Sequence, residues 1–376
     1  MSQINIRNLS NENDDGSPEI VGVSTFSATS FFVPPKGTTA ERPSDCEPGS
    51  IRFNTDTANL EYFRGKTLGW SQFELVNPNL GGGTGSNTGL GVRALFAGGL
   101  TPSLSDVIDF LTISTLGDTQ DFGDISAGKQ SMSAVGSRTR ALNIGGYTTS
   151  HENEIEFVTF ASQGNITDFG NLTSNKNRTA SCSDQVRGIT GGGNPNTNVI
   201  EYLTIAQTGN GVDFGDLTVA RQSAGSFSSS TRGVFAGGYI EPTYSDTIDF
   251  ITISSTGNAT DFGNLTSIRM YMGSSSNSTR GIMGGGLGAS RTNTIEFVTI
   301  ATTSDATNFG DLTSSRTDLA GASSSTRAVF VSGDTPTLVN TIDFVEILTT
   351  GDAIDFGDQT TKRDRPSGCS NGHGGL

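Results

Sequence analysis

The chain has 376 residues, a formal net charge of −15 and a pI near 4.5, which argue against nucleic-acid binding through a broad basic face. Its 50 glycines, against 33% hydrophobic residues, favour tight strands and turns over a leucine-rich helical core. Three cysteines, Cys46, Cys182 and Cys369, are too few and too scattered for a disulfide framework or a zinc cluster.

The first 40 residues are mostly polar. They contain short apolar alternations such as Ile4–Ile6 and a β-rich run that stops at Pro34 and Pro35. A segment of this kind buries little surface by itself. We therefore predict an extended N-terminal arm over residues 1–40, which is either disordered or ordered by docking on a partner.

Residues 41–80 have the pattern of a small β-hairpin module. Two alternating strands, Ser50–Asn54 and Asn59–Phe63, flank an Asp-Thr-Ala turn, and Trp70 follows where it can cover the hairpin. The Gly-rich residues 81–90 are predicted to form a linker, with an inner strand of the next domain as the alternative.

From residue 91 to 376 the chain repeats one unit six times, with a period of 45 to 48 residues. Such a period indicates a propeller or a helical array, and the Gly-, Ser-, Thr- and Phe-rich composition excludes helices. One period accounts for four strands. We predict an all-β, six-bladed β-propeller with the small-residue runs innermost. The Asp/Asn-Phe-Gly turn of each unit contains a phenylalanine predicted to lie between blades: Phe122, Phe169, Phe214, Phe262, Phe309 and Phe356.

The repeat resembles the kelch unit, with a glycine pair after a strand, an apolar strand, an aromatic anchor and a basic residue before the next inner strand. It departs from kelch in having phenylalanine where kelch has tryptophan, and Ser332-Gly333 in the sixth copy. The resemblance implies four-stranded kelch-like blades whose variable loops after the glycine pair form the ligand face. The candidate binding residues in those loops are Tyr147, His151, Tyr239, Tyr244 and Arg291.

A basic residue follows each turn phenylalanine by seven positions. In kelch-like blades this set would form a cationic ring on one face, where an anion or an acidic partner could bind. The alternative is that each basic residue pairs with a nearby repeat carboxylate. The basic residues are Lys129, Lys176, Arg221, Arg269, Arg316 and Arg363, and the recurring carboxylates are Asp109, Glu156, Glu201, Asp249, Glu296 and Asp343.

The two ends of the repeat region compete to complete the first blade, which has no clear inner strand of its own. Ser367–Gly374 resembles an inner strand that no further repeat follows. We expect it to pair beside Arg93–Gly99, because closing the ring would seal both sheet edges. The rival for this position is Thr84–Leu90.

Little in the sequence points to catalysis. His151 and His373 are isolated, and there is no P-loop or dinucleotide fingerprint. Turn carboxylates such as Asp121 and Asp124 are of the type that binds calcium, but hydrogen bonding to their own turn backbone is the interpretation we favour. We predict a protein that is not an enzyme, with no cofactor and no metal.

The hairpin module reads Gly-x-Ile-Arg-Phe-Asn-Thr, then Leu-Glu-Tyr-Phe, then Trp, and is similar to a hairpin of phage virion and tail-fibre proteins. The preceding SFFVPPKGTTAERP resembles structural proteins of cyanobacterial phages. The resemblance implies a virion structural protein, as a tail fibre, a spike, or a decoration of capsid or tail. Residues 1–80 would attach to other virion proteins, and the propeller would bind a host-surface glycan or protein.

The chain has no leader resembling a signal peptide and no apolar run near 18 residues, so we expect synthesis in the host cytoplasm, a virion location and no membrane insertion. Whether it is a homo-oligomer in the particle stays open. A cellular kelch-like interaction module is the alternative function. A glycan-acting propeller enzyme is a third, although the Ser-x-Asp-x-Gly-x-Thr-Trp box of sialidase-like propellers is absent.

Overall fold

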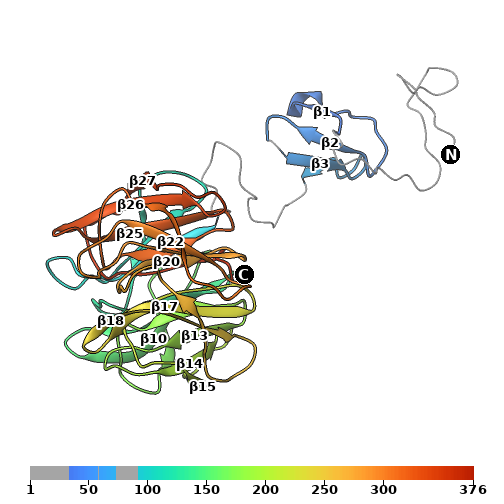
Figure 1. The fold of residues 1–376 in the computed structure, drawn as a ribbon. Coiled ribbons are helices and arrows are strands. Elements are labelled where there is room, and N and C mark those ends of the chain that lie inside the picture. Colours follow the sequence, from blue (N-terminus) through green and yellow to red (C-terminus); the bar gives the residue numbers. More distant parts are fainter. Residues whose placement is uncertain (1–33, 58, 73–91) are drawn as a thin grey trace, which may run out of the picture. The chain divides into compact units, whose positions relative to one another are not determined.

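A computed structural model describes residues 34–57, 59–72 and 92–376. This part of the chain is all-β, with seven four-stranded sheets and one short 3-10 helix, η1 (Thr39–Glu41). The chain divides into two compact units, Met1–Asn77 and Pro78–Leu376. Figure 1 colours the described residues of the first unit blue and those of the second from cyan to red. Within the described ranges, no helix has the length and apolar character needed to cross a membrane.

The first unit contains the predicted hairpin. Strands β2 (Ile51–Asn54) and β3 (Asn59–Phe63) pair antiparallel, and β4 (Trp70–Gln72) continues the sheet beside β3. β1 (Lys36–Gly37) falls within the segment predicted as an arm and pairs parallel with β2. The Trp70 ring lies 5.4 Å from the Phe63 ring, so the tryptophan covers the hairpin as predicted.

One face of this small sheet is held by a polar network. Asn54 Nδ2 donates to Glu61 Oε1 at 2.7 Å, and Arg42 Nε donates to Glu61 Oε2 at 3.1 Å. The hydrogen bond from Arg42 lowers the pKa of the Glu61 carboxyl, which therefore stays ionised within the sheet. A buried polar group needs such partners, because an unsatisfied one costs free energy.

The second unit contains the other six sheets, one for each sequence repeat. The inner strand of each is short and rich in Ser, Gly and Ala, and the next three strands follow in chain order. From the inner to the outer strand the sheets are β28 (Ser367–Ser370), β5 (Arg93–Ala97), β6 (Val107–Thr112), β7 (Gln120–Asp124); β8 (Ser133–Gly136), β9 (Arg140–Tyr147), β10 (His151–Thr159), β11 (Thr167–Asn171); β12 (Ala180–Ser183), β13 (Arg187–Gly191), β14 (Val199–Thr204), β15 (Val212–Asp216); β16 (Gly225–Ser228), β17 (Arg232–Ile240), β18 (Thr243–Thr252), β19 (Thr260–Asn264); β20 (Gly273–Ser276), β21 (Arg280–Gly284), β22 (Thr294–Thr299), β23 (Thr307–Asp311); and β24 (Ala320–Ser323), β25 (Arg327–Asp334), β26 (Leu338–Glu346), β27 (Ile354–Asp358).

The first of these sheets takes its inner strand from the other end of the chain. β28 pairs antiparallel with β5, with Ser367 opposite Ala97 and Ser370 opposite Ala94. This is the pairing predicted for the segment 367–374, although the strand ends at Ser370. The rival segment, 84–90, lies outside the described residues.

The apolar core consists of six clusters, each shared by two neighbouring sheets. The cluster around Phe122, for example, also contains Ala141 and Phe160 of the second sheet. The cluster around Phe356 joins the sixth sheet to Phe96 of the first. The six phenylalanines predicted to lie in turns belong instead to the outer strands, as Phe122 does to β7. They are 2–3% exposed and lie one in each cluster, so their predicted position between sheets is confirmed. The sheets are therefore arranged around an axis in a propeller-like manner.

The glycine after each outer-strand phenylalanine is explained by a close approach between sheets. At Gly123 the backbone has φ +150°, and a Cβ there would lie 2.3 Å from the carbonyl oxygen of Gly164 in the next sheet. The Gly164 N–H donates to the Phe122 carbonyl at 2.9 Å. A side chain at position 123 would separate these backbones, which accounts for the Phe-Gly pair in the repeat.

The arginine before each glycine pair also joins neighbouring sheets. Arg232 lies over the Phe250 ring, 4.5 Å from its centroid, and its Nη1 donates to the Ile300 carbonyl of the next sheet at 2.9 Å. The equivalent arginines that make the same two kinds of contact are Arg93, Arg140, Arg187, Arg280 and Arg327.

Candidate functional site

The repeated basic residues do not form an exposed cationic ring. Their side chains are 0–2% exposed, and each reaches the recurring carboxylate of the next sheet. The expectation of a surface ring is wrong because charges desolvated between sheets require a partner of opposite sign. The alternative, pairing with repeat carboxylates, is what the structure contains: Lys129–Glu156, Lys176–Glu201, Arg221–Asp249, Arg269–Glu296, Arg316–Asp343 and Arg363–Asp109.

These ion pairs are embedded in further hydrogen bonds. Arg221 Nη2 lies 2.8 Å from Asp249 Oδ2 and also donates to the Phe235 carbonyl at 3.2 Å. The carboxylate in turn accepts the Thr218 hydroxyl at 2.6 Å. Hydrogen bonds of this kind offset part of the cost of burying the charges, and the ion pairs link neighbouring sheets.

The loop residues predicted to bind a ligand are half-buried and make contacts within the repeat region. Tyr147 and His151 pack edge to face across the tip of the β9–β10 hairpin, with ring centroids 5.6 Å apart. Tyr239 and Tyr244 pack at 5.9 Å across the β17–β18 hairpin. Arg291 forms an ion pair with Asp334 of the next sheet. Their role in binding stays a prediction.

The six inner strands surround a central channel, and residues of all six line its interior. A second repeated position, which the sequence analysis missed, forms a ring at one end of this channel. It lies two residues after each buried basic residue and just before the inner strand. All six backbones have φ between 53° and 58°, a left-handed conformation that costs a non-glycine residue about 1–3 kcal/mol. The six residues are Ser131, Arg178, Ser223, Tyr271, Asp318 and Arg365. We call them the mouth ring.

Backbone hydrogen bonds connect the mouth ring from member to member. Each N–H donates to the carbonyl of the preceding member, as Arg178 N does to Ser131 O at 2.9 Å. The series returns to its start, because Ser131 N donates to Arg365 O at 3.1 Å. These bonds account for the left-handed conformation, since they hold each strained residue in place.

The mouth ring lines a cavity of about 130 Å³ with side chains that differ around the circle. The Arg178 guanidinium lies over the Tyr271 ring, 5.2 Å from its centroid. Arg365 Nε donates to Asp318 Oδ1 at 3.1 Å. Burial raises the pKa of the Tyr271 phenol and of the Asp318 carboxyl. The mouth ring could have been found in the sequence, because one position of the repeat is occupied by Ser, Arg, Tyr or Asp in different units.

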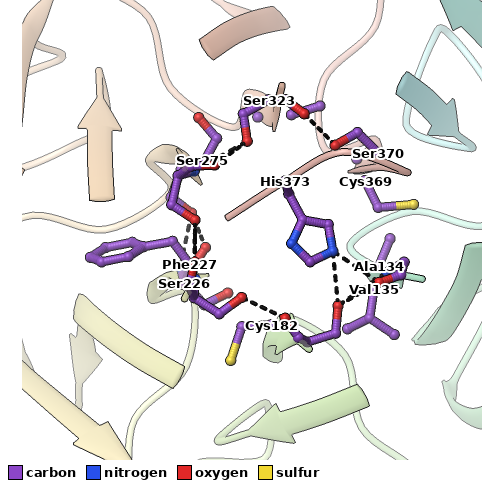
Figure 2. Close-up of a pocket in the computed structure, with 18 of the residues that line it drawn as sticks. Ala134, Val135, Cys182, Ser226, Phe227, Ser275, Ser323, Cys369, Ser370 and His373 are labelled. Atoms are coloured by element: carbon purple, nitrogen blue, oxygen red, sulfur yellow. Dashed lines mark hydrogen bonds between the residues drawn. The ribbon is translucent and has the colours of Figure 1, made fainter. Parts of the chain in front are cut away.

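The other end of the channel is filled by the chain's own residues (Figure 2). The last serine of five inner strands donates its hydroxyl to a backbone carbonyl of the preceding inner strand, as Ser228 Oγ does to Ser183 O at 2.7 Å. Gly136 occupies the sixth position and has no hydroxyl. His373 lies there instead, with Nε2 2.9 Å from Gly136 O and 3.1 Å from Ser183 Oγ.

The hydrogen bonds of His373 define its protonation. The Gly375 N–H donates to His373 Nδ1 at 3.1 Å, so the ring hydrogen is on Nε2 and points to the Gly136 carbonyl. Burial lowers the pKa of His373, which is therefore a neutral, structural residue. Cys182 and Cys369 line the same small cavity, and burial raises the pKa of both thiols to about 12. At that pKa they are unreactive.

No protein-family model matches the sequence, and no curated protein is significantly similar to it. In the part of the chain that the structure describes, no three His, Cys, Asp or Glu side chains are grouped so as to hold a metal ion.

Proposed function

We propose that this chain is a non-enzymatic phage virion structural protein whose second unit is a six-bladed, kelch-like propeller displaying a binding face. The mouth ring carries the proposal. A repeated position usually keeps one chemical character when its role is structural, as the buried ion pairs keep a base on one side and a carboxylate on the other. The mouth ring instead presents two guanidiniums, a phenol, a carboxylate and two hydroxyls around one cavity, which are groups suited to orienting a ligand.

The hairpins around the mouth extend this face. The backbones of Gln130 and Tyr147 exchange both hydrogen bonds, and so do those of Gln222 and Tyr239. The predicted binding residues of both hairpins are therefore at the same end of the channel as the mouth ring. Variable loops on a regular scaffold are a common way to build a recognition surface.

The N-terminal unit is proposed to attach the protein to the particle. It has a sheet and a polar network of its own, and its hairpin carries the resemblance to virion proteins. Under this proposal, residues 1–80 contact other virion proteins and the second unit faces a host-surface glycan or protein.

A truncation tests the division of roles. Removal of residues 1–83 should leave a soluble protein with one cooperative melting transition that no longer joins purified particles, as measured by mass spectrometry of the particles. The full chain is the control. If the truncated protein still assembles, the second unit carries the attachment surface. If particles from the encoding phage lack the full chain altogether, the virion proposal is wrong and the cellular interaction module replaces it.

A further inference from the structure

We propose that the mouth ring binds an acidic monosaccharide unit, with Arg178 as the principal partner of its carboxylate. This inference rests on the proposed function, because it names the ligand class of the same face.

The charge of the cavity is the first argument. Its lining includes Arg178, Arg365 and Asp318, which sum to +1 at neutral pH (two positive charges and one negative). The chain as a whole carries −15. A positive lining in so acidic a protein favours an anionic group over a neutral or cationic one.

The unpaired state of Arg178 is the second argument. Arg365 has Asp318 as its hydrogen-bonded counter-ion, whereas Arg178 forms no ion pair among the described residues and only acts on Asp318 through the field of its charge. Its Nε is buried without a hydrogen-bond acceptor. A partly desolvated guanidinium with unmet hydrogen-bonding capacity is a favourable partner for a carboxylate, which matches its fork of donors in two parallel bonds.

The position of Arg178 is also set before any ligand arrives. Its backbone is held by two bonds of the mouth ring, to Ser131 and Ser223, and its guanidinium stacks on Tyr271. Both restraints reduce the freedom that the side chain would lose on binding. An arginine on the open surface has no such restraints, so ordering it on binding would cost more conformational entropy.

The size and polarity of the cavity favour a sugar over a peptide. A volume of about 130 Å³ is below the range of about 300–1,000 Å³ for drug-sized ligands, so it suits one small ring. The serine hydroxyls at 131 and 223 and the Asp318 carboxylate offer donors and acceptors for ring hydroxyls. Ser223 is 7% exposed and lies beside the Tyr271 phenol.

Calorimetric titration of the full chain with glucuronate, with glucose as the neutral match, tests the proposal. We expect saturable binding of glucuronate and none of glucose. Arg178→Gln should weaken glucuronate binding by about tenfold or more. Arg138→Gln, which removes an exposed arginine after the inner strand β8, is the charge-matched control and should leave binding unchanged. Arg178→Lys keeps the charge but loses the planar fork of donors, so this variant should also bind glucuronate more weakly. If Arg178→Gln lowers the melting temperature, Arg178→Lys replaces it as the test variant.

Three outcomes would overturn the inference. Equal binding of glucose and glucuronate would remove the role of the charge. Binding of an Asp-Glu peptide through Arg178, without binding of glucuronate, would replace the sugar with an acidic protein partner. Absence of any carboxylate binding, while the protein still joins particles and mediates adsorption, would exclude this ligand and leave the proposed function in place.

Discussion

Arg363 of the last repeat forms an ion pair with Asp109 of the first, and the two side chains are fully buried. The same pairing joins Lys129 or its equivalent to the carboxylate of the next sheet in the other five places. The first and last sheets are thus linked by the same side-chain interaction that links sheets adjacent in the sequence.

The buried ion pairs should be costly to break from one side. Asp249→Asn leaves Arg221 without its counter-ion between two sheets and should lower the free energy of unfolding by about 3–5 kcal/mol. Glu346→Gln, in the partly exposed pair with Arg327, is the control and should cost about 0–1 kcal/mol. Urea denaturation measures both. Equal costs would mean that the buried pairs are screened by water.

The phenylalanines of the outer strands should contribute to stability through burial between sheets. Phe262→Ala removes a ring that is 2% exposed and packs edge to face on Phe250, so the expected loss is about 3–5 kcal/mol. Val212→Ala, at a half-exposed position, should change stability by no more than about 0.5 kcal/mol. Thermal melts compare the two variants. A loss below about 1 kcal/mol at Phe262 would contradict its place in the core.

The last ten residues should be needed to protect the edge of β5. Deleting 367–376 removes β28 and exposes the backbone groups of 94–97, so we expect a lower Tm and aggregation detected by light scattering. Deleting only 371–376 keeps β28 and should lower the Tm without exposing that edge. Rapid hydrogen exchange across 367–370 in the full chain would argue instead for closure by residues 84–90.

Asp364 should destabilise the folded state at neutral pH. Burial raises its pKa from 3.8 to about 6, and its Oδ1 has no hydrogen-bond partner. The folded state therefore binds more protons than the unfolded state between those values, and this group's contribution to stability falls as pH rises from about 4 to 6. Asp364→Asn should be more stable than the parent at pH 7 and equal to it near pH 3.5, by urea denaturation. A less stable variant at pH 7 would show that the charge is compensated.

His373 should have the opposite pH dependence. Its pKa is lowered by burial, so the folded state binds fewer protons than the unfolded state, and stability is lost as pH falls below about 6.5. Protonation would place a second hydrogen on Nδ1, which now accepts from Gly375. His373→Gln should reduce the fall in Tm between pH 7 and 5. An unchanged slope would mean that other titrating groups govern it.

Much of the repeat region follows from local pattern. The strands of each unit can be located from its own sequence, because the alternation of apolar and polar residues and the glycine pairs are properties of a few adjacent residues. The burial of Phe262 and its equivalents was predictable for the same reason, since a large apolar ring recurs at one position of an otherwise polar segment in every unit. The hairpin 51–63 was likewise predicted from its turn and alternation.

The sequence by itself determined the number of units, their strands and the apolar anchors, because these depend on spacing along the chain. Only the tertiary structure decided where the charges lie. Whether Arg221 faced water or Asp249 depended on how closely two sheets approach, which spacing does not encode. Arg178 and Tyr271 belong to separate repeats, and the arrangement of inner strands around one axis brings them into a single cavity. The mouth ring therefore exists only in the folded chain, where the left-handed residues of all six units hydrogen-bond to one another.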